Sequence, residues 1–242
     1  MTSEIDRSDE ALAAASEDFG HVYRGTATGV LYAGSEKDVA EAITTAASAG
    51  SGVTVRGTGH SAGGQAVPHD SMVLDLSRMN SVGDVDVEDM TVSCAAGATL
   101  RQLVEATLPL GLLPRPLTNL LDLSVGGVLG VGGGVGPSSH LFGAIASNVV
   151  EMTVVTGDGV EHRCSRTTDP ELFEATIGGL GTCGAILAAH LRLRQAKSRV
   201  RTFYLLYDDH RRWLADQRLI ADSDADAIEG FCSSHVIQTS RG

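Results

Sequence analysis

The turn that contains His60 is the part of the sequence best suited to do chemistry. Residues 57–65 read Gly-Thr-Gly-His-Ser-Ala-Gly-Gly-Gln, and they directly follow the β-branched run of residues 53–56. The backbone N–H groups of such a small-residue turn can surround an anion such as a phosphate without the help of a helix dipole. The turn therefore predicts a phosphate site. The alternative is a surface loop in which His60 is only solvated.

Glycine is the outlier in the composition, with 29 of 242 residues, or about 12% against a background of ~7%. Five glycines lie between Gly52 and Gly64, and eight lie between Gly126 and Gly143. Clustered glycine indicates backbone at positive φ or backbone close to another group, and a large ligand with phosphates is one such group. Residues 114–143 show little periodicity, which predicts a long functional loop.

A second glycine motif, GxGxxG, spans residues 179–184. The Rossmann fingerprint requires a strand before the motif and a helix after it. Here a helical pattern precedes the motif and an apolar strand pattern follows it, so we exclude a Rossmann site. No GxxxxGK[ST] string occurs either, which excludes a P-loop.

The net negative charge of the chain bears on which molecules it can bind. Lys and Arg number 18 against 30 Asp and Glu, a net charge of 18 − 30 = −12, which argues against binding to nucleic acid or to an anionic membrane. No apolar run reaches the ~20 residues that a membrane helix needs. A hydrophobic fraction of 43% is ordinary for a globular protein. A small-molecule substrate is the expected partner, and the sequence gives no indication of an oligomeric state.

The four cysteines are widely spaced and form no CxxC or Cys/His pattern, so we expect no metal site. The first twenty residues are polar and acidic and do not resemble a secretory signal. Free thiols in a reducing compartment are therefore expected, which favours a cytoplasmic protein.

The elements that must position the His60 turn alternate irregularly between strand and helix patterns. Residues 1–20 predict a short helix or a loose arm, residues 114–143 a loop, and Gly157-Asp158-Gly159 a hairpin turn. Strands are expected at residues 29–32, 53–56, 72–76, 90–94, 148–156, 160–164, 185–193, 202–207 and 227–231. Helices are expected from N-caps Ser35, Thr99 and Asp169, and at residues 210–221. This mixture predicts an α+β fold.

Several strings, in order along the chain, resemble one family. They are Arg56-Gly57-x-Gly59-His60-Ser61-x-x-Gly64-Gln65, Gly111-Leu-Leu-Pro-Arg115, Leu123-Ser124-Val125-Gly126-Gly127, Ser147-Asn148-Val149, Val154-Val155-Thr156-Gly157, Asp169-Pro170-Glu171-Leu172-Phe173, Gly178-Gly179-Leu180-Gly181, Tyr207-Asp208-Asp209 and Glu229-Gly230-Phe231. Together they resemble FAD-dependent oxidoreductases of the vanillyl-alcohol oxidase and p-cresol methylhydroxylase (PCMH) type, and most closely cytokinin dehydrogenases and their bacterial relatives. The resemblance covers about residues 18–235.

The resemblance implies a PCMH-type FAD-binding fold made of two α+β subdomains, followed by the start of an incomplete α+β substrate domain. It divides the chain into an N-terminal arm (residues 1–19), an FAD-binding domain (residues 20–196) and the beginning of a substrate domain (residues 197–242). It also implies that FAD is bonded covalently to His60. A neutral imidazole is a nucleophile that could form such a bond. The cofactor-binding residues that it implies are Val55, Arg56, Gly57, Thr58, Gly59, His60, Ser61, Gln65, Asn119, Ser124, Gly126, Gly130, Gly134 and Ile186.

The chain departs from this family at one catalytic position. Where cytokinin dehydrogenases carry a Thr-Asp pair, this sequence has Thr118-Asn119, and the resemblance makes Asn119 the position of the substrate-side base. An amide can hydrogen-bond but cannot act as a base. Asp122, three residues later, could substitute only if the local backbone were helical. Its alternative role is that of a solvated or capping carboxylate.

The second departure is length, because family members continue well beyond Gly242, so we expect a truncated chain. The leading hypothesis is an oxidoreductase that transfers a hydride from a C–N or C–O bond of a small organic substrate to FAD. The alternatives are a non-catalytic FAD-binding fragment, an alcohol or sugar oxidase of the same family, and a flavin-free scaffold.

Overall fold

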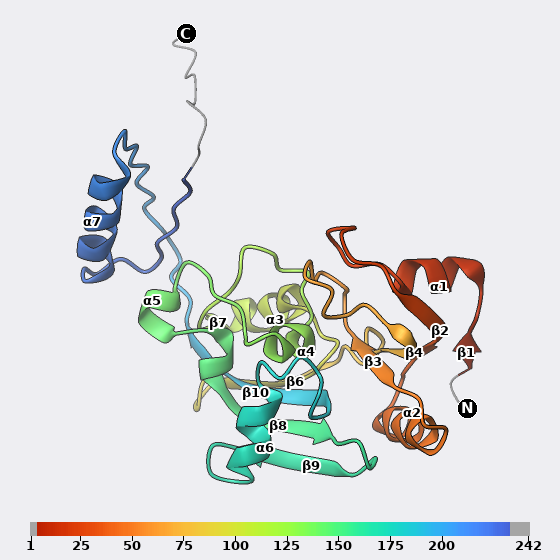
Figure 1. The fold of residues 1–242 in the computed structure, drawn as a ribbon. Helices are drawn as coiled ribbons and strands as arrows, with labels where there is room; N and C mark the ends of the chain where they lie inside the picture. The colour runs from red at the N-terminus through yellow and green to blue at the C-terminus, as the bar shows by residue number, and fades with distance from the viewer. Residues whose placement is uncertain (1–3, 233–242) are drawn as a thin grey trace.

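The structure is a computed structural model that describes residues 4–232 and contains two β-sheets with helices packed on them (Figure 1). The first sheet has the strand order β1-β2-β4-β3 and is built from residues near the N-terminus. The second has six strands, in the order β5-β6-β10-β8-β9 with β7 also paired to β10. The α+β prediction is therefore confirmed at the level of fold class.

The four-stranded sheet consists of β1 (Ile5–Asp6), β2 (Thr26–Tyr32), β4 (His69–Asp75) and β3 (Val53–Arg56). β4 runs parallel to both β2 and β3, and β1 is antiparallel to β2. Successive residues of β2 face opposite sides, as strand geometry requires. Val30 packs with α1 (Asp9–Ala15), and Leu31 belongs to the cluster that contains Val39 of α2 (Glu36–Ser48). The two helices thus cover opposite faces of the sheet (Figure 1).

The six-stranded sheet is entirely antiparallel around its long central strand, β10 (Ala185–Gln195). Its other strands are β5 (Val82–Asp86), β6 (Thr91–Ala95), β7 (Leu112–Pro114), β8 (Val149–Val155) and β9 (Glu161–Ser165). The helical segments that accompany it are α3 (Leu100–Thr107), η1 (Leu108–Leu110), α4 (Val125–Gly130), α5 (Ser139–Phe142), η2 (Ile145–Asn148) and α6 (Pro170–Thr176).

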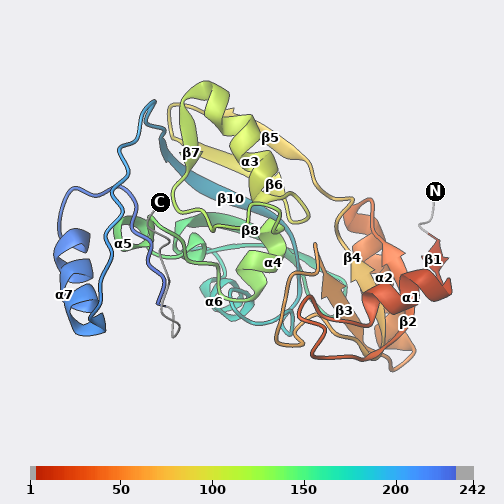
Figure 2. The ribbon, with the colours of Figure 1, turned by 90° about the horizontal axis from the view of Figure 1, so that it is seen from above.

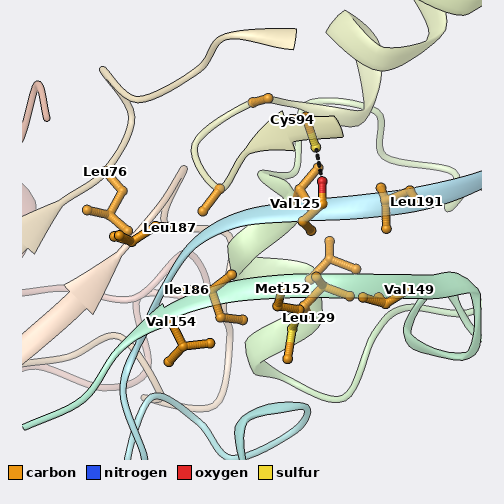
Figure 3. Packing of buried hydrophobic residues seen from close by; sticks show 14 of the residues in the cluster. Leu76, Cys94, Val125, Leu129, Val149, Met152, Val154, Ile186, Leu187 and Leu191 are labelled. Carbon is orange, nitrogen blue, oxygen red and sulfur yellow. Dashed lines mark hydrogen bonds between the residues drawn. The ribbon is translucent and has the colours of Figure 1, made fainter. Parts of the chain in front are cut away.

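The main core joins α4 to the six-stranded sheet. Val125 and Leu129 of α4 belong to one buried cluster with Met152 of β8 and Leu187 of β10, and all four side chains are at most 1% exposed; Leu129 lies beside Met152 and Leu187 beside Leu76 (Figure 3). The Cys94 thiol donates a hydrogen bond to the Ala189 carbonyl at 3.7 Å within this core. Burial of so much apolar surface holds α4 rigidly on the sheet.

Several predicted termini match the structure. Ser35 accepts from the Asp38 N–H, and Thr99 forms a reciprocal capping box with Gln102. Gly111 ends η1 in the left-handed conformation, with φ of 74°. Asp169 precedes α6 as predicted, but its φ is 47° and its side chain forms no cap hydrogen bond.

Other predictions were wrong or incomplete. Residues 114–143 are not a continuous loop, because α4 and α5 form within them. Residues 202–207 and 227–231 form no strand. Residues 202–207, with their aromatic side chains, pair with no strand within residues 4–232, and Tyr204 is 93% exposed. The sequence patterns also missed β1, β5 and β7, which are short or polar.

The chain beyond β10, residues 197–232, extends away from both sheets and carries α7 (His210–Ala221) (Figure 1). α7 has no buried residue among its twelve, and its predicted bounds are confirmed. We call residues 197–232 the C-terminal extension. None of the described helices combines the length and the apolar character that crossing a bilayer requires.

Candidate functional site

The loop after β3 lies beside α4 (Figure 2), and a cleft is lined by that loop, by α4 and by the start of β10. The enclosed part has a volume of about 200 Å³, so a dinucleotide would extend beyond it along the open sides. One wall consists of residues 55–61, which are the end of β3 in the four-stranded sheet and the loop that follows it. The other wall consists of α4, which packs on the six-stranded sheet, and Ile186 of β10. The site is therefore built between the two sheets.

The loop of residues 57–61 begins where β3 ends, and two of its contacts require glycine. A Cβ on Gly57 would lie 2.0 Å from Ser124 Oγ, so only glycine allows the loop to approach the start of α4 this closely. Gly59 has a φ of 72°, and a Cβ there would meet the Arg56 guanidinium at 2.5–2.9 Å. The Ser124 N–H donates to Thr58 Oγ1 at 3.3 Å and ties the two walls together.

Several polar groups of this loop have no hydrogen-bond partner within the described chain. The backbone N–H groups of Thr58, Gly59, His60 and Ser61 donate no hydrogen bond to any described residue. Ser61 Oγ is buried without a hydrogen-bond partner, and so is Thr176 Oγ1, whose residue also lines the cleft. Buried polar atoms normally have partners, so two orphans in one cleft indicate that a polar ligand completes it.

The opposite wall is apolar and closely packed. A Cβ on Gly126 would lie 2.7 Å from the Ala96 Cβ, so this glycine lets α4 sit directly on the end of β6. A Cβ on Gly130 would meet no atom within 4 Å, and Gly130 lines the cleft. Ile186 of β10 contributes an apolar side chain beside them. A flat aromatic ring system fits against such a wall.

His60 lies half-buried at the cleft, and two neighbours contact its ring. His60 Nδ1 lies 3.3 Å from Thr58 Oγ1. The ring of Phe19 stacks on the imidazole with centroids 4.8 Å apart and an interplanar angle of 25°. None of the described residues that line the cleft is Asp or Glu, although the whole chain carries a net charge of −12. An anionic ligand is thus not repelled there.

The structure brings together most of the residues that the sequence singled out. Those on the cleft lining are Val55, Arg56, Gly57, Thr58, Gly59, His60, Ser61, Gln65, Ser124, Gly126, Gly130 and Ile186. Gly134 and Asn119 are not on it. A Cβ on Gly134 would meet Thr118 Cγ2 at 2.7 Å and Val128 Cγ1 at 3.3 Å, so this glycine allows the chain to pack behind α4.

Asn119 contacts the C-terminal extension. Its Nδ2 donates a short hydrogen bond to Glu229 Oε1. The extension makes further contacts nearby, because Ser138 Oγ donates to the Asp226 carbonyl at 2.9 Å and the Ile228 N–H donates to the Pro137 carbonyl at 2.8 Å. The position that the sequence equates with a base therefore carries an amide with a carboxylate beside it.

Asp122 is engaged elsewhere. Its carboxylate forms a two-point ion pair with Arg101, at 2.6 Å from Nε and 3.1 Å from Nη2. The hydrogen bonds from Arg101 hold the pKa of Asp122 below its usual range. The backbone around Asp122 is a turn rather than a helix. Both features make Asp122 a poor general base, so the structure favours its interpretation as a surface carboxylate rather than a catalytic one.

Sequence reasoning missed part of the lining although a signal was present. The GxGxxG string was set aside as a dinucleotide motif, but Leu180, Gly181 and Gly184 from that string reach the cleft. These residues lie in the turn between α6 and β10. A helix therefore precedes the motif and a strand follows it, which is the reverse of the order in a Rossmann site. Gly127, Val128 and Val131 also line the cleft and lie within the run of residues 126–134 that the resemblance places near the flavin, whereas the lining residues that were missed are Ala66, Leu76, Ala96, Leu123 and Thr176.

Metal-ligating side chains and the buried cysteine thiols are the other groups of this chain that could take part in chemistry. Within residues 4–232, no three His, Cys, Asp or Glu side chains are arranged to hold a metal ion. Burial raises the pKa of the Cys94 thiol to about 12 and that of the Cys164 thiol to about 11, which keeps both protonated and unreactive near neutral pH. Among the described residues that line the cleft, His60 carries the only nucleophilic side chain other than hydroxyls.

Comparison with known proteins gives a consistent result. A family described as the FAD binding domain matches residues 27–165. An uncharacterized oxidoreductase from the fasciation locus of Rhodococcoides fascians is 38% identical over 223 residues, which cover 92% of this chain and 50% of the relative. Cytokinin dehydrogenase 2 of Arabidopsis thaliana is 35% identical over 237 residues, covering 95% of this chain and 47% of the relative. The chain spans about half the length of these curated relatives.

Proposed function

The chain belongs to the FAD-binding domain family and is similar to cytokinin dehydrogenases, and from this premise we propose that the cleft is the FAD site of an oxidoreductase. The proposed reaction removes a hydride from a C–N or C–O bond of a small organic substrate and transfers it to FAD. The observation that carries the proposal is the cleft itself, with free N–H groups and His60 on one wall and apolar side chains on the other.

The residues present fit this cofactor. The orphaned Ser61 Oγ and Thr176 Oγ1 can hydrogen-bond its polar groups, and the N–H groups of residues 58–61 can hold its pyrophosphate as a nest. The apolar wall that contains Gly130 and Ile186 supports placement of the isoalloxazine ring there. The proposed FAD-binding set is therefore Val55, Arg56, Gly57, Thr58, Gly59, His60, Ser61, Gln65, Ser124, Gly126, Gly130 and Ile186.

His60 is the proposed attachment point for the flavin. A ring nitrogen of His60 would bond to the carbon of the flavin 8-methyl group in place of one C–H bond. The net reaction would release one proton from that methyl group, one proton from the imidazole and two electrons, which an acceptor such as molecular oxygen would take up. When bound, FAD then supplies the hydride acceptor for substrate oxidation.

The substrate side is proposed to lie between the cleft and the C-terminal extension. Asn119 precedes the cleft residue Leu123 by four positions, and its amide can orient a substrate amine or hydroxyl. Glu229, hydrogen-bonded to Asn119, offers the carboxylate that can accept the proton of the substrate N–H or O–H group. This pair supports oxidation of an amine or an alcohol with Glu229 as base.

We also propose the domain division that these roles imply. Residues 20–196 form the two-subdomain FAD-binding unit, residues 197–242 begin a substrate domain, and residues 1–19 form an arm. Within the described residues, β1 and α1 of that arm pack on β2, so the arm is attached to the FAD-binding unit. The four unpaired cysteines support a cytoplasmic location.

The test is to purify the protein, denature it with acid and ask where the flavin is. Flavin in the precipitate, and a protein mass increased by that of FAD, support covalent attachment. His60→Ala is expected to lose the covalent flavin and to retain part of the bound FAD, because the N–H groups of the loop do not depend on the imidazole. Purified protein that holds no flavin and does not bind added FAD contradicts the proposed site.

The substrate proposal is tested with an allylic amine and a primary alcohol, using an artificial electron acceptor. Glu229→Gln is expected to lower turnover by a factor of about 10² to 10⁴, the usual worth of a positioned base, with flavin content unchanged. Flavin-loaded protein that oxidises neither substrate contradicts the catalytic part and leaves an FAD-binding module. Asn119→Asp replaces the hydrogen bond to Glu229 by a second carboxylate in contact with it, so one of the two stays protonated near neutral pH and amine oxidation by this variant is expected to increase with pH.

A further inference from the structure

A segment near the N-terminus, residues 15–24, lies along the His60 loop, although the two are separated by about forty residues in sequence. The Phe19 N–H donates to the Ser61 carbonyl at 2.9 Å, beside His60. A Cβ on Gly20 would lie 3.5 Å from the Ala62 Cβ, and a Cβ on Gly64 would meet the Tyr23 ring at 3.0 Å. We call residues 15–24 the clasp, because they contact the loop at several successive points.

The clasp is anchored to the end of β3 and is also stabilised by hydrogen bonds within itself. The Arg56 guanidinium, at the end of β3, donates to the Ala15 carbonyl at 3.0 Å and to the Glu17 carbonyl at 3.4 Å. Asp18 is only 3% exposed, and its Oδ1 accepts from the Val22 and Tyr23 N–H groups. This carboxylate therefore closes a turn around Phe19, which fixes the direction in which the Phe19 side chain leaves the backbone.

The ring of Phe19 stacks on the imidazole of His60. Its side chain belongs to no apolar core, since the residue is 58% exposed, yet one face of its ring stacks on His60. An aromatic side chain left this exposed loses hydrophobic stabilisation that a buried position would give. The imidazole is contacted on one face by this ring and at Nδ1 by Thr58 Oγ1, and the two contacts restrict rotation of the His60 side chain.

We propose that Phe19 is a positioning residue that orients His60 for attachment of the flavin, and that the clasp is thereby part of the cofactor site. The inference rests on the covalent attachment proposed above. Bond formation requires a ring nitrogen to approach the methyl carbon in one direction, and misplacement by ~1 Å can cost a factor of about 10² in rate. A ring stacked on His60 supplies that orientation before the cofactor arrives.

The kinetic test uses apoprotein from a riboflavin-auxotrophic host, mixed with FAD and quenched in acid over time. Phe19→Ala is expected to bind FAD with nearly unchanged affinity but to attach it at least about tenfold more slowly. Phe19→Tyr retains the ring and is expected to restore the wild-type rate. Phe203→Ala is the matched control, because Phe203 is 73% exposed and lies in the C-terminal extension.

A second readout is independent of the cofactor. In the apoprotein, the ring current of Phe19 is expected to shift the His60 ring protons upfield in the NMR spectrum, and Phe19→Ala is expected to remove that shift. Thermal unfolding of each variant checks that the fold is retained.

The outcomes separate this inference from the proposed function. Wild-type protein that attaches FAD, with Phe19→Ala attaching it at the same rate, overturns the role of Phe19 and leaves His60 as the attachment point. Wild-type protein that binds FAD but never attaches it overturns both the covalent bond and the positioning role. A slow Phe19→Ala variant that Phe19→Tyr fails to rescue also contradicts positioning by the ring.

Discussion

The FAD-binding unit and the C-terminal extension differ in how each is held in place. In the first, α4 lies on β8 and β10 with side chains that are at most 1% exposed. In the second, α7 buries none of its residues, and the extension is joined to the rest by scattered polar contacts such as Asn119–Glu229 and the hydrogen bond from Ser138 Oγ to the Asp226 carbonyl. Apolar burial makes the cofactor side rigid, whereas the proposed substrate side depends on a few hydrogen bonds.

This difference implies that cofactor binding and substrate handling can be separated by substitution. Changes at the cleft should remove FAD from the protein. Changes in the extension should leave FAD bound and alter only what reaches it. The predictions below test that separation, beginning with the largest expected effect.

The first prediction concerns the open space beside Gly130. Gly130→Val is expected to abolish FAD binding, a loss of at least about 10² in affinity, because the new side chain projects into the cleft rather than into the core. Gly157→Val is the matched control, because a Cβ on Gly157 also meets no atom within 4 Å but lies outside the cleft. FAD titration monitored by flavin fluorescence measures both. Equal affinity of the two variants would show that FAD does not pass Gly130.

The second prediction compares two leucines on helices. Leu103 of α3 is fully buried, and Leu103→Ala is expected to lower the free energy of unfolding by about 2–5 kcal/mol. Leu219 of α7 is 70% exposed, and Leu219→Ala is expected to change it by less than about 0.5 kcal/mol. Urea denaturation gives both values. A comparable loss for Leu219→Ala would mean that α7 is packed against a partner in solution.

The third prediction concerns the attachment of the extension. Asn119→Ala removes the hydrogen bond to Glu229, a contact between exposed side chains that is worth about 0.5–1 kcal/mol. Tryptic cleavage at Arg211 and Arg218 is expected to become several-fold faster, while residues 26–195 stay intact. Digestion followed by mass spectrometry measures the rates. Unchanged rates at these sites would show that other contacts hold the extension.

The smallest expected effect is at the surface of the FAD-binding unit, at the Arg101–Asp122 pair. Arg101 lowers the pKa of Asp122, so the pair stabilises the fold above the unfolded pKa of Asp122 and loses that contribution as pH falls through the lower folded value. Arg101→Ala is expected to raise the pKa of Asp122 toward ~3.9. NMR titration of the carboxyl carbon measures it. Both side chains are at least half exposed, so the effect on stability is small.

The sequence predicted the local features whose causes are local. The helix starts at Ser35 and Thr99 follow from side-chain caps, and the hairpin of β8 and β9 follows from its Gly-Asp-Gly turn. The His60 loop was identified because small residues and one histidine directly follow a strand pattern. Each of these depends on fewer than about ten consecutive residues.

What the sequence could not predict depends on contacts between distant segments. α4 is glycine-rich and has weak helical propensity, and it forms because Val125 and Leu129 are buried on the sheet. Residues 202–207 have the composition of a strand but pair with no other strand in the described part of the chain. The stacking of Phe19 on His60 joins two loops from different parts of the chain, and no local pattern indicates it.

The position of β10 has a consequence for the order in which the protein folds during synthesis. β10 is the last strand of the described chain, yet it lies between β6 and β8 in the sheet. The β5–β6 and β8–β9 hairpins can form as they leave the ribosome, but they cannot join until residues 185–195 have emerged. Until then both hairpins expose an unpaired apolar edge, which is the period in which the nascent chain is most prone to aggregate.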